Sequence, residues 1–513
     1  MLNYVIRRFF SSAAVLLVAS FLIYLLVDFA IDPLEDLRTS TAPNKQALID
    51  GRIAMLQLDV PAPARFLDWL GGVGGCFVGQ CDLGMAWQTN QAVVDVLGSA
   101  LVVSLRLVAV ATILAMLVGI TVGIISALRQ YSGFDYGMIF LSFLLYSLPT
   151  FWVAVLLKQW VAIGFNDFLQ DPTISLAVIL GTGAVIGVIV AAAAGGEWWR
   201  RFAIFGVAFV ATSGVLAYIS ATQWLLTPSL GPVLIGLTGL GIAVVVTLLS
   251  AGLRNRRALL AALTTAVVLT IAWFPLQSVF RNPGWNGFAT FALALGAIAL
   301  GVAIGYAYGG PDKNQSARGA GITGLGVFLL LFVDRVMQLW EPYMNSSVIN
   351  GRPIATIGSQ TPGLAANYWV QQLDTFTHLL LPTMALLLIS FAGYTRYSRA
   401  SMLEVMNQDY VRTARAKGLT ERTVVMRHAF RNSLIPLATI IPIDLASILG
   451  GAIITERIFG WRGMGTMFLS ALDKNEIEPV MAYVLVIGGV TVIANFLADL
   501  LYAALDPRIR VNA

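Results

Sequence analysis

Long apolar runs restrict the fold of this chain more than any other feature. The first, residues 9–27, is long enough to cross a bilayer as a helix, and runs of similar length recur to the end of the sequence. Backbone N–H and C=O groups inside a membrane must bond to one another, so such runs fold as helices. With 58% hydrophobic and only 12% charged residues, the chain is predicted to be an all-α polytopic membrane protein of about twelve spans.

The basic residues sit in short loops between these runs. Arg7 and Arg8 precede the first run, which predicts that the chain starts on the cytoplasmic side. No small-residue cleavage site follows before Asp32, so we expect a retained first span rather than a signal peptide. This loop pattern accounts for the net charge of +5, and no nucleic-acid partner is predicted.

A polar stretch, residues 30–95, is predicted to form an external subdomain. Cys76 and Cys81 lie in it on the oxidising side, where they can form a disulfide; the alternative is a pair of free thiols. With His378 and His428 they are the only Cys and His residues, so no metal centre is predicted. The sequence also lacks the G-x-x-x-x-G-K-[ST] motif that cradles phosphates.

The longest basic segment, residues 396–436, lies between two strongly apolar runs. It contains eight Lys or Arg residues and three acidic residues, which places it in the cytoplasm. Residues 398–417 are predicted to form one helix that ends at Gly418, and Thr420 is predicted to cap a second helix. The apolar stripe expected on the first helix consists of Met402, Val405, Met406, Val411 and Ala414.

Two pieces of this segment, DYVRTARAKG at 409–418 and RHAFRNSLIP at 427–436, resemble the EAA loop of ABC-importer permeases, and most closely their dipeptide/oligopeptide/nickel branch. The resemblance implies a coupling helix that docks on a cytoplasmic ATPase. The alternative is an ordinary basic loop that contacts lipid headgroups. The residues that the resemblance assigns to coupling are Asp409, Tyr410, Arg412, Thr413, Ala414, Arg415, Ala416, Lys417 and Gly418.

The same family pattern divides the chain. Residues 455–465, TERIFGWRGMG, resemble the segment after the family's fifth helix, with Arg462 where a proline is more usual. A six-helix permease core is therefore expected from residues 1–163 and 376–513, which we call the core. Residues 164–375, called the insertion, have no counterpart in the family pattern.

The insertion is predicted to form one accessory bundle of about six spans, followed by an external loop, residues 338–375. Its helices contain few ionisable residues, which suits packing against the core or lipid, and Asp334 and Arg335 can pair with each other. The six apolar runs cover residues 174–194, 202–220, 229–250, 258–280, 287–308 and 319–337.

By this resemblance the chain is not an enzyme and holds no cofactor. It would form half of the pathway of an importer for di- or oligopeptides in a bacterial inner membrane, with both termini in the cytoplasm. A second permease subunit, two ATPase subunits that bind ATP and Mg²⁺, and an external peptide-binding protein are the implied partners.

Three residues are expected to border the translocation pathway: Pro149, Asp444 and Glu456. Pro149 removes a backbone hydrogen bond inside a predicted span, 136–163, and gives either a static kink or a moving joint. Asp444 either faces the pore and contacts a peptide amine or makes an interhelical hydrogen bond. Two other functions remain open, a twelve-span ion-coupled secondary transporter and a membrane scaffold without transport activity.

Overall fold

The computed structural model describes residues 2–41, 43–310, 312–364 and 366–505. These residues form an all-α membrane protein, as predicted, and their only strands are β1 (Met85–Ala86) and β2 (Gln91–Ala92), an antiparallel pair. Eleven of the described helices are long and apolar enough to cross a membrane, and a bent pair would make twelve. The end of the predicted core, residues 506–513, lies outside the described residues.

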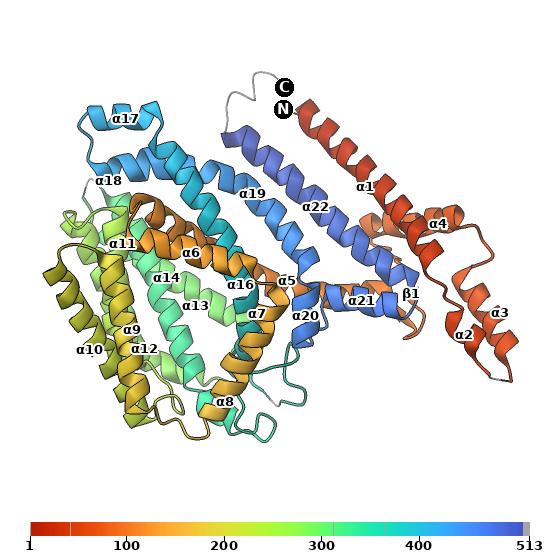
Figure 1. The fold of residues 1–513 in the computed structure, drawn as a ribbon, viewed down its shortest axis with the longest axis horizontal. Coiled ribbons are helices and arrows are strands. Elements are labelled where there is room, and N and C mark those ends of the chain that lie inside the picture. The colour runs from red at the N-terminus through yellow and green to blue at the C-terminus, as the bar shows by residue number, and fades with distance from the viewer. Residues whose placement is uncertain (1, 42, 311, 365, 506–513) are drawn as a thin grey trace.

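The first and last helices of the chain lie side by side. Helix α1 (Leu2–Ala30) packs along α22 (Ile477–Leu505), and Arg8 forms an ion pair of 2.6 Å with Asp499 between them (Figure 1). Short elements follow α1 and form the part of the molecule that contains β1 and β2. These elements are α2 (Glu35–Thr39), α3 (Lys45–Leu56), α4 (Ala62–Gly75) and a 3₁₀ turn (Cys76–Val78).

Helices α5 (Val93–Leu128) and α16 (Tyr368–Met406) pack together along their length and form the centre of the core. Two glycines of α5 let the helices approach closely. A Cβ atom at Gly119 would lie 2.7 Å from the Tyr394 Cβ atom, and one at Gly123 would lie 1.9 Å from the Ser398 Oγ atom. Small residues at such positions are typical of helix pairs in membranes.

The predicted span 136–163 is not one straight helix. Helix α6 (Gly133–Ser147) and the following helical arm meet at an angle of 101°. Leu148 has the extended conformation (φ −82°, ψ 129°) that a residue before proline favours, and Pro149 begins the second arm. That arm consists of α7 (Thr150–Leu156), a π-helical turn (Leu157–Ile163) and α8 (Gly164–Phe168).

The insertion contains six long helices in two groups. Helices α9 and α10 pair as a hairpin, and α9 also contacts α6. Helices α11 to α14 pack together as a four-helix bundle, and α14 contacts α16. The six helices are α9 (Leu176–Ala194), α10 (Trp198–Thr222), α11 (Gly231–Ser250), α12 (Arg256–Phe280), α13 (Gly287–Ala307) and α14 (Lys313–Met337).

The expected pairing of Asp334 with Arg335 is wrong. The Asp334 carboxylate instead accepts hydrogen bonds from the backbone N–H groups of Leu230 and Gly231, at 2.8 and 3.0 Å, and from the Trp273 indole at 2.7 Å. The backbone donors stand at the start of α11 and have no partner within their own helix, so a carboxylate from α14 is a better acceptor there than a neighbour on its own helix.

The predicted helix 398–417 is interrupted. Helix α16 ends at Met406, where the Asn407 side chain bonds back to the Leu403 carbonyl oxygen at 3.1 Å and competes with the helix. Gln408 is extended (φ −72°, ψ 149°), and the chain then turns into α17 (Asp409–Ala416). Helix α17 lies at the same end of the molecule as the start of α1 and the end of α22 (Figure 1).

The remaining elements lead into and out of this end. Helix α15 (Trp340–Met344) precedes the loop before α16. After α17 the chain forms α18 (Glu421–Thr423), a π-helical turn (Val424–Ala429), α19 (Phe430–Gly451), α20 (Ile453–Phe459) and α21 (Met464–Asp473) before α22.

Candidate coupling site

Helix α17 rests on the core through two apolar side chains. Val411 is fully buried and Ala414 is 6% exposed, and their spacing of three places them on one face of the helix. They pack against Val424, with Val405 and Met406 at the edge of the cluster. We call Val411 and Ala414 the apolar foot of α17.

The other side chains of α17 point away from the core. Arg412 and Asp409 are 68% and 98% exposed and form a loose ion pair of 3.7 Å, which contributes little to stability. The structure therefore separates the predicted coupling residues into a buried foot and an exposed face. The exposed face comprises Asp409, Tyr410, Arg412, Thr413, Arg415, Ala416 and Lys417.

Gly418 ends α17 in the predicted way. Its φ of +74° lies in the left-handed region, which glycine adopts without a Cβ penalty. The Gly418 N–H donates to the Arg415 carbonyl oxygen at 2.9 Å, and the Leu419 N–H donates to that of Ala414 at 3.4 Å. This pair of bonds satisfies the last carbonyl groups of the helix and reverses the chain direction.

The turn after Gly418 is fixed by a cap and an ion pair. Thr420 caps the next helix, as predicted, because its hydroxyl accepts a bond of 3.4 Å from the Thr423 N–H. Arg415 reaches back across the turn to Glu421, with N–O distances of 2.7 and 3.2 Å. The ion pair therefore joins α17 to the segment after the turn, and the cap fixes the start of that segment.

A buried ion pair that sequence analysis missed supports this end of the core. Arg399 of α16 binds Asp135 of α6 through two bonds of 2.7 and 2.9 Å, and Asp135 is only 1% exposed. Ser126 and the Tyr131 N–H complete the shell of donors around this carboxylate. Ser132 caps α6 and Asp135 follows three residues later, a local signal of a helix start that does not reveal Arg399 as the partner.

Glu456 is enclosed by hydrogen-bond donors at the start of α21. One carboxylate oxygen accepts from the Ser104 hydroxyl at 2.5 Å, and the other accepts from the backbone N–H groups of Gly465 and Thr466, at 2.9 and 3.1 Å. Burial raises the pKa of the Glu456 carboxyl above its usual value, against the opposing effect of these bonds. Glu456 therefore caps α21 and ties it to α5.

The three residues expected to border the pathway share no hydrogen bond with one another among the described residues. Pro149 is exposed at the bend between α6 and α7, and Asp444 lies half-buried on α19 beside the Tyr394 side chain. Among the described residues, the hydrogen-bond partners of the Glu456 carboxylate are Ser104, Gly465 and Thr466, and neither Pro149 nor Asp444 is one of them. Their assignment to the pathway stays a prediction.

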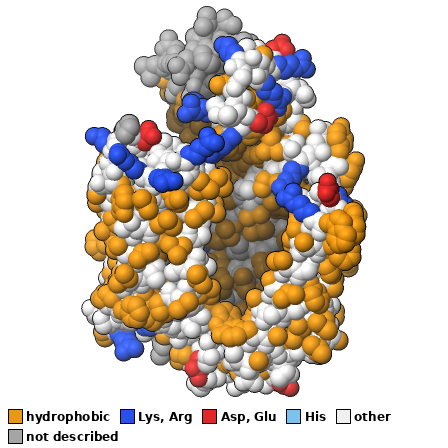
Figure 2. All heavy atoms as spheres, turned by 90° about the vertical axis from the view of Figure 1, so that its left-hand side faces the viewer, with side chains coloured by type: hydrophobic (Ala, Val, Ile, Leu, Met, Phe, Trp, Pro, Cys, Tyr) orange, Lys and Arg blue, Asp and Glu red, His pale blue; other side chains and the backbone are white. Residues whose placement is uncertain are grey.

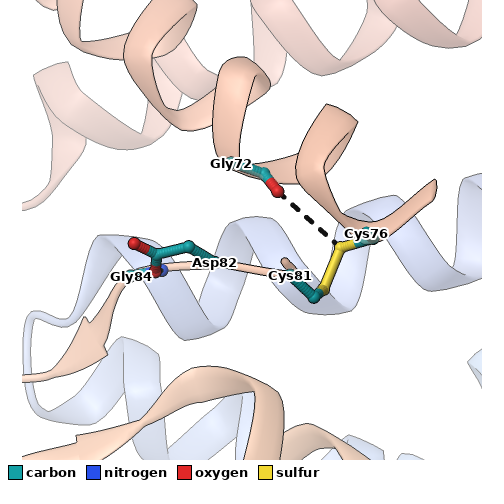
Figure 3. Close-up of a disulfide and its surroundings, with 5 residues drawn as sticks. All are labelled: Gly72, Cys76, Cys81, Asp82 and Gly84. Carbon is teal, nitrogen blue, oxygen red and sulfur yellow. Dashed lines mark hydrogen bonds between the residues drawn. A yellow bond between two sulfur atoms is a disulfide. The ribbon is translucent and has the colours of Figure 1, made fainter. Parts of the chain in front are cut away.

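The structure joins Cys76 and Cys81 in a disulfide at the end of α4 (Figure 3). The Gly72 carbonyl oxygen lies 3.8 Å from the Cys76 sulfur and accepts a bond of 3.3 Å from the Asp82 N–H. Phe77 stands between the two cysteines and is 92% exposed. In the described ranges no group of three or more His, Cys, Asp or Glu side chains could hold a metal ion.

Residues 119–511 match the family described as binding-protein-dependent transport system inner membrane component. This match covers α17, its foot and the Glu456 segment, together with the insertion. The chain belongs to this family. It is therefore a multi-pass membrane permease, and an ion-coupled secondary transporter is not favoured.

Curated relatives are similar to parts of the chain. The oligopeptide transport system permease protein OppB of Mycobacterium tuberculosis is 43% identical over 155 residues, which are 30% of this chain and 48% of that protein. The dipeptide transport system permease protein DppB of Escherichia coli is 32% identical over 252 residues, 45% of this chain and 74% of that protein. The chain thus spans about half the length of the mycobacterial relative and three quarters of the Escherichia coli one.

Proposed function

We propose that this chain is the permease subunit of an ATP-driven ABC importer for di- or oligopeptides and forms half of the translocation pathway. The family supports the transport role, and the names of the relatives support peptides as cargo. In this proposal a second permease subunit completes the pathway, and an external peptide-binding protein delivers the substrate. Two cytoplasmic ATPase subunits bind ATP and Mg²⁺, while this chain holds no cofactor and catalyses no reaction.

The observation that carries the proposal is the exposed face of α17 on its buried foot. A partner that docks on Arg412 and its neighbours would push α17 as a unit, because Val411 and Ala414 are packed against Val424. Close packing transmits such a displacement rather than absorbing it. The Arg399–Asp135 ion pair then offers a route from α16 to α6 and to the bend at Pro149.

The proposed orientation and domain division follow from the same site. If α17 is cytoplasmic, the N-terminus and the end of α22 are cytoplasmic too, and the disulfide-containing subdomain, residues 30–95, is external. The protein would lie in the bacterial cell membrane. Its core, residues 1–163 and 376–513, would carry transport, and residues 164–375 would be accessory.

The test is ATP-driven peptide uptake by the reconstituted transporter. A variant with Tyr410→Ala and Arg412→Glu changes the exposed face and leaves the apolar foot intact. We expect uptake to fall about tenfold or more, because charged and aromatic side chains dominate docking energies. Arg201→Glu reverses an exposed charge on α10 of the insertion and should leave uptake unchanged.

Normal ATP-driven uptake by the double variant would reject coupling through α17. Uptake that follows an ion gradient without any ATPase subunit would reject the importer itself. The two results are distinguishable, because the first retains ATP dependence and the second does not.

A further inference from the structure

A cavity of about 810 Å³ lies where the insertion meets the segment around α17. It is bordered by Leu128 at the end of α5, Leu248 near the end of α11 and Met406 at the end of α16. This part of its lining is completed by Glu421, Arg422, Val425 and Met426. The three helices are membrane spans by length and hydropathy, and all three end here. The cavity therefore lies at the boundary between the hydrocarbon region and water.

One wall of the cavity carries charge. Arg415 and Glu421 neutralise each other in their ion pair, whereas Arg422 donates a hydrogen bond to the Leu248 carbonyl oxygen. A backbone carbonyl carries only a partial charge, so the guanidinium of Arg422 gives this wall a formal charge of +1. Basic pockets between membrane helices at the cytoplasmic side attract acidic lipid headgroups.

The other wall is apolar and only partly covered by protein. Leu249 is 61% exposed, and Leu248 and Met426 are 44% and 42% exposed. Figure 2 shows a long hollow with mostly hydrophobic walls below the end of the molecule where Lys and Arg side chains gather. A second cavity, of about 640 Å³ and almost entirely apolar lining, follows α5 and α16 farther from α17.

The arrangement of the insertion explains why the hollow exists. The α9–α10 hairpin and the α11–α14 bundle attach to the core separately, through α6 and α14. None of the residues of α10 is buried, so most of the surface that α10 does not pack against α9 is open to lipid. Hydrocarbon chains must fill any space that a membrane protein leaves open at this depth.

We propose that the cavity beside Arg422 binds an anionic phospholipid of the cytoplasmic leaflet. The guanidinium of Arg422 contacts the phosphate, and the acyl chains lie against Leu248 and Leu249 and continue into the hollow. A free anion would not use the leucine wall, which is why we infer a lipid. The proposal uses the cytoplasmic orientation of α17 but does not depend on the transported substrate.

The experiment uses the purified full chain, with the lipid that it retains identified by native mass spectrometry. Thermal unfolding is followed during titration with phosphatidylglycerol, phosphatidylcholine or inorganic phosphate. We expect retention of phosphatidylglycerol and a rise in Tm with this lipid alone. Arg422→Gln should weaken its binding about tenfold, equivalent to about 1.4 kcal/mol, and Arg427→Gln, an exposed neighbour outside the cavity, should not.

A second variant tests the apolar wall without touching the charge. Leu249→Trp fills the cavity and should also weaken phosphatidylglycerol binding, whereas Leu237→Trp, at a similarly exposed site of α11 outside the cavity, should not. Equal effects of phosphatidylcholine and phosphatidylglycerol would overturn the proposal. Stabilisation by inorganic phosphate would also overturn it. An equal loss of phosphatidylglycerol binding in Arg422→Gln and Arg427→Gln would overturn it as well.

Discussion

In the core, buried carboxylates join several helices in addition to close packing, whereas the insertion is held mainly by close packing of small residues, with Asp334 as a buried carboxylate inside its bundle. In the core, Asp135 binds Arg399 across α6 and α16, and Glu456 ties α5 to α21. In the insertion, α13 and α14 pack so closely that a Cβ atom at Gly305 would lie 2.4 Å from the Ala317 Cα atom. The core therefore combines the close packing of α5 and α16 with directional bonds at a few points, and the insertion is held mainly by continuous contact along its helices.

This difference suits the two proposed roles. The core helices are interrupted at the bend of Pro149 and at Gln408, and the proposed coupling requires the segments on either side of these breaks to move as units. The insertion has uninterrupted helices, and the Asp334 carboxylate inside its bundle caps α11 by accepting hydrogen bonds from two neutral backbone N–H groups. We therefore expect charge changes to affect the core most and volume changes to affect the insertion most.

The largest expected effect is that of Asp135→Ala. This change leaves the guanidinium of Arg399 partly buried without its carboxylate, and breaking a buried ion pair costs about 3–5 kcal/mol of unfolding free energy. Denaturant unfolding of the purified chain measures the loss. Asp167→Ala is the control, because it removes an exposed ion pair with Arg352 and should cost less than about 1 kcal/mol of unfolding free energy. Equal losses of unfolding free energy in the two variants would contradict the prediction.

Gly305→Val should disturb the insertion and spare the core. The added side chain meets the α14 backbone, and overpacking of this kind costs about 1–3 kcal/mol. Gly296→Val on the same helix faces open space and serves as the control, with little packing cost. Hydrogen exchange should show the loss of protection in α13 and α14; a loss that begins in α5 and α16 would show that the two regions are not separate.

Stability should depend on pH through Glu456. Because burial raises the pKa of this carboxyl above 4.5, the folded protein holds the proton more tightly than the unfolded chain does. Its contribution to stability is full below the unfolded pKa and is lost as pH rises through the raised folded pKa, with a slope of at most about 1.4 kcal/mol per pH unit.

Glu456→Gln cannot titrate and should lack this slope. The measurement is the difference in unfolding free energy between the wild type and this variant from about pH 4 to pH 7. A wild type that gains stability relative to the variant as pH rises would mean that the hydrogen bonds from Ser104, Gly465 and Thr466 outweigh burial.

Gly418→Ala should have the smallest effect. The position has space for a Cβ atom, so the cost is that of the left-handed backbone, about 1 kcal/mol. Gly393→Ala, in open space within α16, should instead stabilise the helix by about 0.5–1 kcal/mol. Thermal unfolding of both variants gives the comparison, and a shift in the same direction for both would contradict it.

The fold class was predictable because hydropathy and helix length act locally. Runs such as 229–250 and 258–280 coincide closely with α11 and α12, and Gly418 and Thr420 mark turns through their own backbone and side chain. The break at Asn407 was missed because residues 398–417 have a continuous apolar stripe, and a side chain that bonds back to its own helix leaves no trace in that pattern.

The contacts that sequence analysis missed most often are those between residues distant in the sequence. Asp135 and Arg399 are 264 positions apart. Asp334 was expected to pair with its neighbour Arg335, whereas the two backbone groups that bond to it lie 104 and 103 residues earlier. The division of the insertion into a hairpin and a bundle was missed for the same reason. Its six runs are alike in composition, and only their packing separates them.

Site-directed cross-linking tests the proposed coupling most directly. Both native cysteines are bonded to each other, so Arg412→Cys introduces a single reactive thiol on the exposed face of α17. Arg200→Cys, at the start of α10, is the matched exposed site in the insertion. We expect Arg412→Cys, and not Arg200→Cys, to cross-link to a co-purified ATPase subunit. A cross-link from position 200 alone, or from neither position, would contradict the account.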